Sequence, residues 1–330
     1  MLDKYKREIK YLRISLTDLC NLRCLYCMPE QGVCKKQHTD MMTEEEILRA
    51  VKVAAKIGIR KIRLTGGEPL VKKNIIDIVS KIRDIAGIEE ICLTTNGSYL
   101  SKYVKDLKSA GLDRINISLD TLDKNKFKYI TRVGNIEDTL RGIDAALETN
   151  FKKVKINTVL IGGFNDDEIV DIANLTLKQE TDVRFIELMP MYDGGYFGKE
   201  AFIPSKVVLE KIKSYYKGVF ENDDKILTDV TTADNVIAKL YRINGAKANV
   251  GLISPVNNHF CSMCNRIRLT SDGKLKPCLH SSEEISIKNL SEEEMEKRFV
   301  EAILSKPKSH DVLSFENRSK ANRNMNEIGG

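Results

Sequence analysis

Six short runs of apolar and β-branched residues alternate with amphipathic stretches across residues 10–215, and this alternation restricts the fold more than any other feature. Strands that alternate with helices in this way form a parallel sheet covered by helices. Six units are too few to close the eight-unit barrel. We therefore predict an α/β protein, an incomplete (βα)6 TIM-like barrel open on one side. The predicted strands are Tyr11–Leu16, Lys61–Thr65, Glu90–Thr94, Arg114–Leu119, Val154–Leu160 and Val183–Leu188.

The stretches between these strands carry helix signals. Thr43 and Glu46 form a capping box, and apolar residues then recur on one face as far as Ala55. Similar patterns cover Ile75–Ile85, Tyr99–Ala110, Ile136–Thr149 and Asp167–Leu177.

After about residue 215 the pattern changes, and short strand-like pieces follow at Val236–Ile243 and Ala248–Ile253. We therefore predict a barrel over residues 1–215 and a smaller segment over residues 216–330 that packs across the open side.

Composition places the chain among globular proteins and limits its partners. Of 330 residues, 42% are hydrophobic and 30% are charged, and no run of about 18 apolar residues occurs. The charged N-terminus lacks the apolar region of a signal peptide, so we expect a cytoplasmic protein without a membrane span. A net charge of +6 does not by itself indicate a nucleic acid polymer, but a local basic pocket would suit a nucleoside triphosphate.

Small and polar residues follow the predicted strands at the point where each strand ends. They are Gly66-Gly67-Glu68-Pro69, Thr95-Asn96-Gly97, Asp120, Gly162-Gly163 and Met189-Pro190. Parallel α/β folds place their chemistry at the carboxyl ends of the strands, and glycines there allow a ligand to approach the backbone closely. Any single glycine pair is as readily explained as a turn. Several such ends on one rim favour a functional site.

Three cysteines follow the first strand with the spacing C-x3-C-x2-C: Cys20, Cys24 and Cys27. Three thiolates can hold three corners of an iron–sulfur cube, whereas a closed electron-transfer cluster takes four cysteines. The fourth iron would then be open to a bound molecule. The alternative is a structural zinc site, with His38 as the fourth ligand. A disulfide does not suit a chain without signs of secretion.

A second group, Cys261, Cys264 and Cys278, has the spacing C-x2-C-x13-C. It predicts either a zinc site completed by His280 or a second open cluster. Between these cysteines lie Arg266 and Arg268, which share one face if the segment is extended. Two adjacent guanidiniums suit phosphate oxygens or ring carbonyls, so an anionic ligand is expected there. The alternative is a solvated pair on the surface. Of the remaining cysteines, Cys92 is expected to be a core residue and Cys34 has no assigned role.

Together these motifs resemble the radical S-adenosylmethionine superfamily. The C-terminal cysteines around Arg266 and Arg268, with the terminal Gly329-Gly330, resemble more narrowly the GTP 3′,8-cyclase family of molybdenum cofactor biosynthesis. The resemblance extends over essentially the whole chain. It implies two 4Fe-4S clusters, one on each cysteine triplet, and S-adenosyl-L-methionine as a further cofactor.

The resemblance also implies roles for individual residues. S-adenosylmethionine would contact Tyr26, Gly66, Gly67, Glu68, Pro69, Ser118 and Met189. GTP would contact Arg13, Arg63, Thr94, Lys155, Arg266 and Arg268, with Lys61 and Arg184 as further candidates. The tail ending in Gly329 and Gly330 would enter the active site and act in catalysis together with Arg266 and Arg268. The strand positions of Arg13, Arg63, Lys155 and Arg184 agree with this, because charges in apolar strands need a partner.

The implied reaction converts GTP to (8S)-3′,8-cyclo-7,8-dihydroguanosine 5′-triphosphate. A 5′-deoxyadenosyl radical would abstract the ribose 3′ hydrogen, and the resulting carbon radical would attack C8 of guanine. The implied partners are an electron donor, the downstream cyclic pyranopterin monophosphate synthase and a second copy in a homodimer. The rival hypotheses are a peptide-modifying radical enzyme with auxiliary clusters and a non-catalytic zinc or iron–sulfur regulator.

Overall fold

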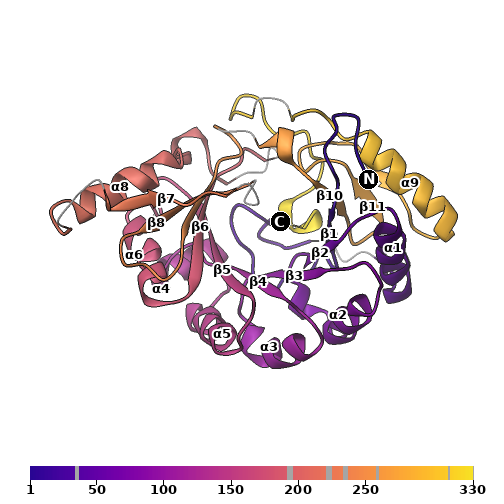
Figure 1. Ribbon diagram of the computed structural model, residues 1–330, viewed down its shortest axis with the longest axis horizontal. Coiled ribbons are helices and arrows are strands. Elements are labelled where there is room, and N and C mark those ends of the chain that lie inside the picture. The colour runs from indigo at the N-terminus through magenta and orange to yellow at the C-terminus, as the bar shows by residue number, and fades with distance from the viewer. Residues whose placement is uncertain are drawn as a thin grey trace.

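Six parallel strands stand next to one another in chain order and curve around the centre of the molecule (Figure 1). They are β1 (Tyr11–Ser15), β2 (Lys61–Thr65), β3 (Glu90–Thr95), β4 (Arg114–Ser118), β5 (Lys153–Leu160) and β6 (Thr181–Glu187). This computed structural model describes residues 1–33, 37–191, 196–220, 225–232, 237–257, 260–310 and 313–329. Within them the sheet is not closed, so the predicted incomplete α/β barrel is confirmed.

Helices cover the outside of these strands (Figure 1). The capping box of Thr43 and Glu46 starts α1 (Glu44–Lys56) as predicted. The other helices are α2 (Ile75–Arg83), α3 (Leu100–Ser109), α4 (Lys124–Thr131), α5 (Ile136–Glu148), α6 (Ile169–Ala173), α7 (Leu175–Lys178), α8 (Lys206–Tyr216) and α9 (Glu292–Leu304). The single helix predicted over Asp167–Leu177 is wrong, because the chain breaks at Asn174 into α6 and α7.

The strands that follow residue 215 join both edges of the same sheet. They are β7 (Leu227–Asp229), β8 (Lys239–Ile243), β9 (Val250–Ile253), β10 (Arg266–Leu269), β11 (Lys274–Lys276) and β12 (Ile285–Ser286). β10 pairs in parallel with β1, and β9 pairs in parallel with β6. Short 3-10 helices lie at His38–Asp40, Pro69–Val71, Lys199–Ala201, Cys261–Met263 and Met325–Glu327. The division of the chain between residues 215 and 216 stays a prediction.

The pleat of the strands separates an apolar core from a polar interior. Leu12 and Ile14 on β1, and Ile62 and Leu64 on β2, are fully buried in the hydrophobic core cluster. The alternate residues of the same strands, such as Arg13, line the interior cavity of the barrel. Successive side chains of a strand point to opposite faces, so one strand serves both regions. None of the described helices is long and apolar enough to span a bilayer.

Candidate active site

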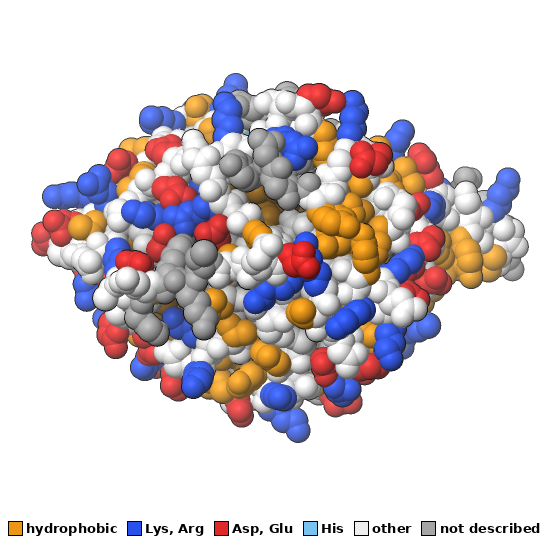
Figure 2. Space-filling model, turned by 180° about the vertical axis from the view of Figure 1, so that it is seen from behind, with side chains coloured by type: hydrophobic (Ala, Val, Ile, Leu, Met, Phe, Trp, Pro, Cys, Tyr) orange, Lys and Arg blue, Asp and Glu red, His pale blue; other side chains and the backbone are white. Residues whose placement is uncertain are grey.

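A cavity of about 480 Å³ occupies the inside of the barrel, and both cysteine triplets line it. Cys20, Cys24 and Cys27 lie in the loop after β1, and Cys261, Cys264 and Cys278 flank β10 and β11. The two sets are more than 230 residues apart in the chain. The parallel pairing of β10 with β1 is what brings them to one chamber. On the outer face shown in Figure 2, positively and negatively charged side chains are interspersed.

Backbone contacts hold the first cysteine loop in place. The amide of Cys27 donates to the carbonyl of Cys24 at 2.9 Å. The guanidinium of Arg132, at the C-terminus of α4, donates to the backbone carbonyls of Arg23 and Met28 at 2.8 and 3.1 Å. The sulfur of Cys20 accepts from the Leu22 amide at 3.3 Å and from Asn96 Nδ2 at 3.8 Å. The loop and the end of β3 therefore each present a donor to the sulfur of Cys20.

Burial raises the pKa of all three of these thiols. The pKa of Cys20 rises to about 11 and that of Cys27 to about 12, and the pKa of Cys24 rises well above its ordinary value. A coordinated metal deprotonates a thiol outright, so metal binding would stabilise the thiolates that this environment otherwise disfavours. Three cysteines can serve as the donor set of a 4Fe-4S cluster that leaves one iron open to another ligand.

Gly66 and Gly67 lie against the start of the cysteine loop. A Cβ on Gly66 would lie 2.5 Å from the carbonyl oxygen of Thr17, and one on Gly67 would lie 2.4 Å from that of Leu19. Only glycine permits this approach. The Gly67 amide donates to the Thr17 carbonyl at 2.7 Å, which locks the end of β2 onto the loop.

Glu68 is a buried carboxylate that connects neighbouring strand ends. It accepts from the Thr95 hydroxyl and the Asn96 amide at 2.7 Å each and from the Leu70 amide at 3.0 Å. Burial raises its pKa to about 7, although these donors oppose the rise. Pro69 is buried in the following 3-10 helix, outside the cavity lining.

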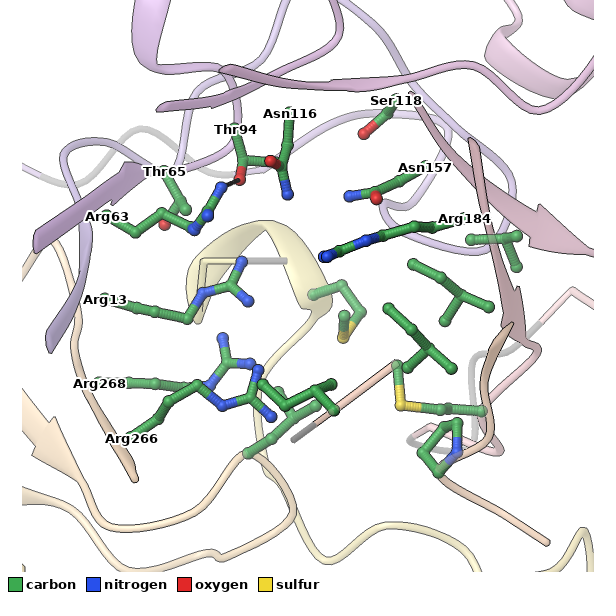
Figure 3. Close-up of a pocket in the computed structure, with 18 of the residues that line it drawn as sticks. Arg13, Arg63, Thr65, Thr94, Asn116, Ser118, Asn157, Arg184, Arg266 and Arg268 are labelled. Carbon is green, nitrogen blue, oxygen red and sulfur yellow. Dashed lines mark hydrogen bonds between the residues drawn. The ribbon is translucent and has the colours of Figure 1, made fainter. Parts of the chain in front are cut away.

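Basic side chains from several strands meet inside the cavity. Arg13, Arg63, Arg266 and Arg268 point into it from one side, and Arg184 points toward them from the opposite wall (Figure 3). Arg63 donates to the Tyr11 hydroxyl and, at 3.1 Å, to the Thr94 hydroxyl. Lys61 is paired with Glu90, and Lys155 lies 3.5 Å from Asp182. The Nε atom of Arg184 is buried and has no hydrogen-bond partner among the described residues.

Burial, together with these neighbouring cations, lowers several pKa values. Burial, and to a smaller extent the neighbouring Arg268 guanidinium, lowers the pKa of Arg13 well below its ordinary value. Burial, and to a smaller extent Arg266, lowers the pKa of Arg268 to about 10. Burial, and to a smaller extent Arg184, lowers the pKa of Lys155 to about 7. Such a chamber is electrostatically strained until an anion enters it.

The second triplet lies beside two cations of the cavity wall, Arg266 and Lys306. Burial opposes ionisation of Cys264, but Arg266 and Lys306 outweigh it and lower the pKa of this thiol to about 6. His280 Nδ1 lies 3.1 Å from the Ser319 hydroxyl, and its ring packs edge-on against His310 at 4.7 Å between centroids.

The C-terminal tail enters the ring of strands (Figure 1). Arg268 donates to the carbonyls of Ile328 and Gly329 at 2.7 and 3.0 Å. Gly329 has φ of +74°, and a Cβ there would lie 2.3 Å from the Thr65 hydroxyl oxygen. Arg323 anchors the tail through bonds of 2.7–3.0 Å to Asp272 and Glu284.

Comparison with known proteins places the chain in a family. Residues 14–176 match the Radical SAM superfamily, and residues 181–312 match Molybdenum Cofactor Synthesis C. The chain is 48% identical over 335 residues to GTP 3′,8-cyclase of Alkaliphilus metalliredigens, with all of both chains covered. It is 49% identical to GTP 3′,8-cyclase of Peptoclostridium acidaminophilum, covering 100% of this chain and 98% of that one. The chain belongs to the GTP 3′,8-cyclase family of radical SAM enzymes.

Solved structures of more distant proteins share the fold of this cyclase family member. Streptococcus suis SuiB aligns with a TM-score of 0.65 at 15% identity, over 92% of this chain and 68% of that one. Native anSMEcpe with bound AdoMet aligns with a TM-score of 0.58 at 14% identity, over 92% of this chain and 82% of that one. At these identities the likeness concerns the fold alone.

Most residues predicted for the site of this cyclase family member lie together in the cavity. Its lining includes Tyr26, Gly66, Gly67, Glu68, Ser118, Met189, Arg13, Lys61, Arg63, Thr94, Lys155, Arg184, Arg266 and Arg268. Gly330 and Cys34 lie outside the described residues, and so does the side chain of His38. Cys92 is fully buried in β3, as predicted.

A single-ion zinc site gains no support. Among the side chains that the structure describes, no three His, Cys, Asp or Glu residues converge so that they could hold one metal ion. A structural zinc ion needs four ligands at about 2.0–2.3 Å from one point. The described side chains therefore show no converged set of zinc ligands, whereas an iron–sulfur cluster agrees with the radical SAM family to which the chain belongs.

Several residues of the cavity wall carry no sequence motif of their own that predicts them. They include Tyr11, Arg114, Asn116, Asn157 and Lys306. Four of them could have been found by counting alternate positions along β1, β4 and β5. Tyr11, Asn116 and Asn157 lie two residues from Arg13, Ser118 and Lys155, and Arg114 lies two residues before Asn116. Lys306 follows a helix that was not predicted, and no local pattern marks it.

Proposed function

We propose that this chain converts GTP to (8S)-3′,8-cyclo-7,8-dihydroguanosine 5′-triphosphate, the first step of molybdenum cofactor biosynthesis. The observation that carries this proposal is the single cavity that both thiol triplets and a wall of arginines line. Such a cavity can accommodate a nucleotide between two clusters. Full-length identity to relatives named GTP 3′,8-cyclase supports the same reaction.

The cofactor assignments follow from the two donor sets. Cys20, Cys24 and Cys27 would hold the cluster that binds S-adenosylmethionine, beside Tyr26, Gly66, Gly67, Glu68, Ser118 and Met189. Cys261, Cys264 and Cys278 would hold the second cluster. When bound, the cofactors supply a 5′-deoxyadenosyl radical that removes the ribose 3′ hydrogen.

The residues of the chain position the nucleotide and balance its charge. A triphosphate of roughly four negative charges would neutralise Arg13, Arg63, Lys155 and Arg184, which otherwise repel one another. Lys61 and Thr94 would contribute from the same wall. Arg266 and Arg268 would orient the nucleotide beside the second triplet. The tail, which ends in Gly329 and Gly330, would act in catalysis by excluding water from a radical reaction.

We place the protein in the cytoplasm, where thiols stay reduced. The proposed partners beyond GTP are an electron donor, the cyclic pyranopterin monophosphate synthase that uses the product, and a second copy in a homodimer.

The decisive experiment is anaerobic incubation of the reconstituted protein with S-adenosylmethionine, dithionite and GTP. We expect about eight irons per chain, 5′-deoxyadenosine and a cyclised product with the mass of GTP. ATP in place of GTP is the matched control, because it keeps the triphosphate and changes the base. Formation of 5′-deoxyadenosine with peptides but not with GTP would favour a peptide-modifying enzyme. Bound zinc without absorbance near about 400 nm would favour a regulator.

A further inference from the structure

Lys306 is a buried lysine that ties together the two segments of the second cysteine triplet. It lies two residues past the end of α9 and is 3% exposed. Its Nζ atom donates to the carbonyls of Arg266 and Pro277, at 2.9 Å each. Arg266 lies two residues after Cys264, and Pro277 directly precedes Cys278. One ammonium therefore fixes the spacing between the loops that carry these two thiols.

The charge of Lys306 is not matched by any carboxylate that the structure describes. Two other buried cations nearby are each paired with a carboxylate. Lys276 has Glu284 at 3.2 Å, and Arg7 has Asp3 at 2.6 Å. Carbonyl oxygens satisfy the hydrogen bonds of an ammonium but leave its charge uncompensated, which is costly in a protein interior. Lys306 also lines the cavity beside two arginines, Arg266 and Arg268, which add to the positive charge.

We propose that Lys306 is a positioning residue for the second cysteine triplet and the counter-charge of the iron–sulfur cluster that the triplet holds. This inference rests on the proposed function, since it needs a cluster at that position. Three thiolates bring negative charge to an ammonium that has no carboxylate partner among the described residues. Net charge and hydrogen bonding around a cluster set its reduction potential, and a nearby cation favours the more negative, reduced form. Lys306 therefore raises the potential of the second cluster.

Arg7 offers a matched comparison at the same triplet. It donates to the carbonyl of Cys261 at 2.7 Å and to those of Pro307 and Lys308 at 2.6 and 3.0 Å. Its charge is already balanced by Asp3. Removing Arg7 and Asp3 together thus loosens the triplet without changing the net charge near the cluster.

The test uses the full chain with Cys20, Cys24 and Cys27 changed to Ser, so that only the second triplet can hold a cluster. Iron content and reduction potential are measured after anaerobic reconstitution in Lys306→Gln, Lys306→Met and Lys306→Arg. We expect both neutral variants to shift the potential to more negative values, or to lose the cluster, and Lys306→Arg to restore the parent behaviour. The double variant Asp3→Asn, Arg7→Met should reduce the iron content without shifting the reduction potential. Lys308→Met, at an exposed position, should change neither the iron content nor the potential.

An unchanged potential in a neutral variant that keeps its cluster would overturn the proposal. So would a loss of cluster that Lys306→Arg does not restore, because a packing role would explain it. The proposed function fails in a different way. In that case the parent chain with Lys306 intact holds no cluster on the second triplet, or the unmodified protein forms no product from GTP.

Discussion

Arg13 on β1 lies directly beside Arg268 on β10 in a parallel strand pair. Arg63 on β2 lies beside Arg13 on its other side, so three guanidiniums stand in one row across three strands. Like charges at this spacing repel, and burial strengthens the repulsion. The row is therefore arranged for a polyanion rather than for the stability of the empty protein.

Replacing Arg13 with Met should weaken nucleotide binding without destabilising the protein. A charge-assisted hydrogen bond contributes about 1.5–3 kcal/mol, so the Kd for GTP should rise roughly ten- to hundredfold. Without nucleotide, the unfolding temperature should stay close to that of the parent, because loss of a charge beside Arg268 and Arg63 offsets loss of the contacts that Arg13 makes. Isothermal titration and thermal unfolding of the anaerobically reconstituted protein measure the two quantities. A large fall in unfolding temperature without nucleotide would show that Arg13 stabilises the fold instead.

Arg266→Ala and Arg268→Ala should reduce turnover of GTP far more than they reduce iron content. Both side chains line the cavity, and Arg268 also holds the tail through two carbonyls. We expect a fall in kcat of at least about tenfold, which corresponds to loss of one orienting contact of about 1.4 kcal/mol. Iron analysis and product formation on the same samples test this. An equal loss of iron and of activity would place these arginines in cluster assembly.

The sequence predicts the barrel well because its signals are local. Each strand run was found to within two residues, since apolar β-branched runs and their flanking turns are read within a few residues. The break at Asn174 was missed because periodicity continues across it, although Asn favours helix ends over helix interiors. α9 was also missed, even though Ser291 and Glu294 form a capping box before it.

The candidate site was likewise predictable only where its sequence signals are local. Cysteine spacing predicts two donor sets, but it does not say that they share one chamber. That result depends on β10 joining β1, a pairing between residues more than 250 positions apart. The position of Lys306 depends on the same long-range packing, since the residue carries no motif of its own. Local patterns thus identify side chains that could bind a ligand or a cofactor, whereas the topology of the sheet decides which of these side chains lie together.

Gly329→Ala should disturb the tail and leave the rest of the protein intact. The new Cβ would clash with the Thr65 hydroxyl at 2.3 Å, and Ala would also be strained at φ of +74°. We expect a strong loss of product formation with unchanged iron content, and an unfolding temperature within about 2 °C of the parent, because the tail is a small part of the core.

Gly218→Ala is the matched control for Gly329. Gly218 has φ of +73°, but a Cβ there would meet no atom within 4 Å. It therefore carries the same backbone strain without the clash and lies at the end of α8, away from the cavity lining. Equal loss of activity in both variants would show that strain alone, and not the contact with Thr65, explains the effect.

Lys155 should make GTP binding depend on pH. Burial and the Arg184 guanidinium lower its pKa to about 7, against about 10.4 in an unfolded chain. Between these values the unfolded chain binds more protons, so this lysine makes folding stability rise with pH from about 7 to about 10. A bound triphosphate favours the charged form and reverses the shift. GTP binding should therefore take up a proton, and its Kd should rise as the pH increases from about 7 to about 9.

Two variants isolate this effect from the titration of the nucleotide itself. Lys155→Met removes both the charge and the proton uptake, so binding should be weak and its remaining pH dependence should be that of GTP. Lys155→Arg keeps the charge over the whole range, so binding should stay tight at a pH of about 9. Titration calorimetry in buffers of different ionisation enthalpy, without S-adenosylmethionine to prevent turnover, counts the protons directly. If Lys155→Met takes up as many protons as the parent, the titrating group is another one.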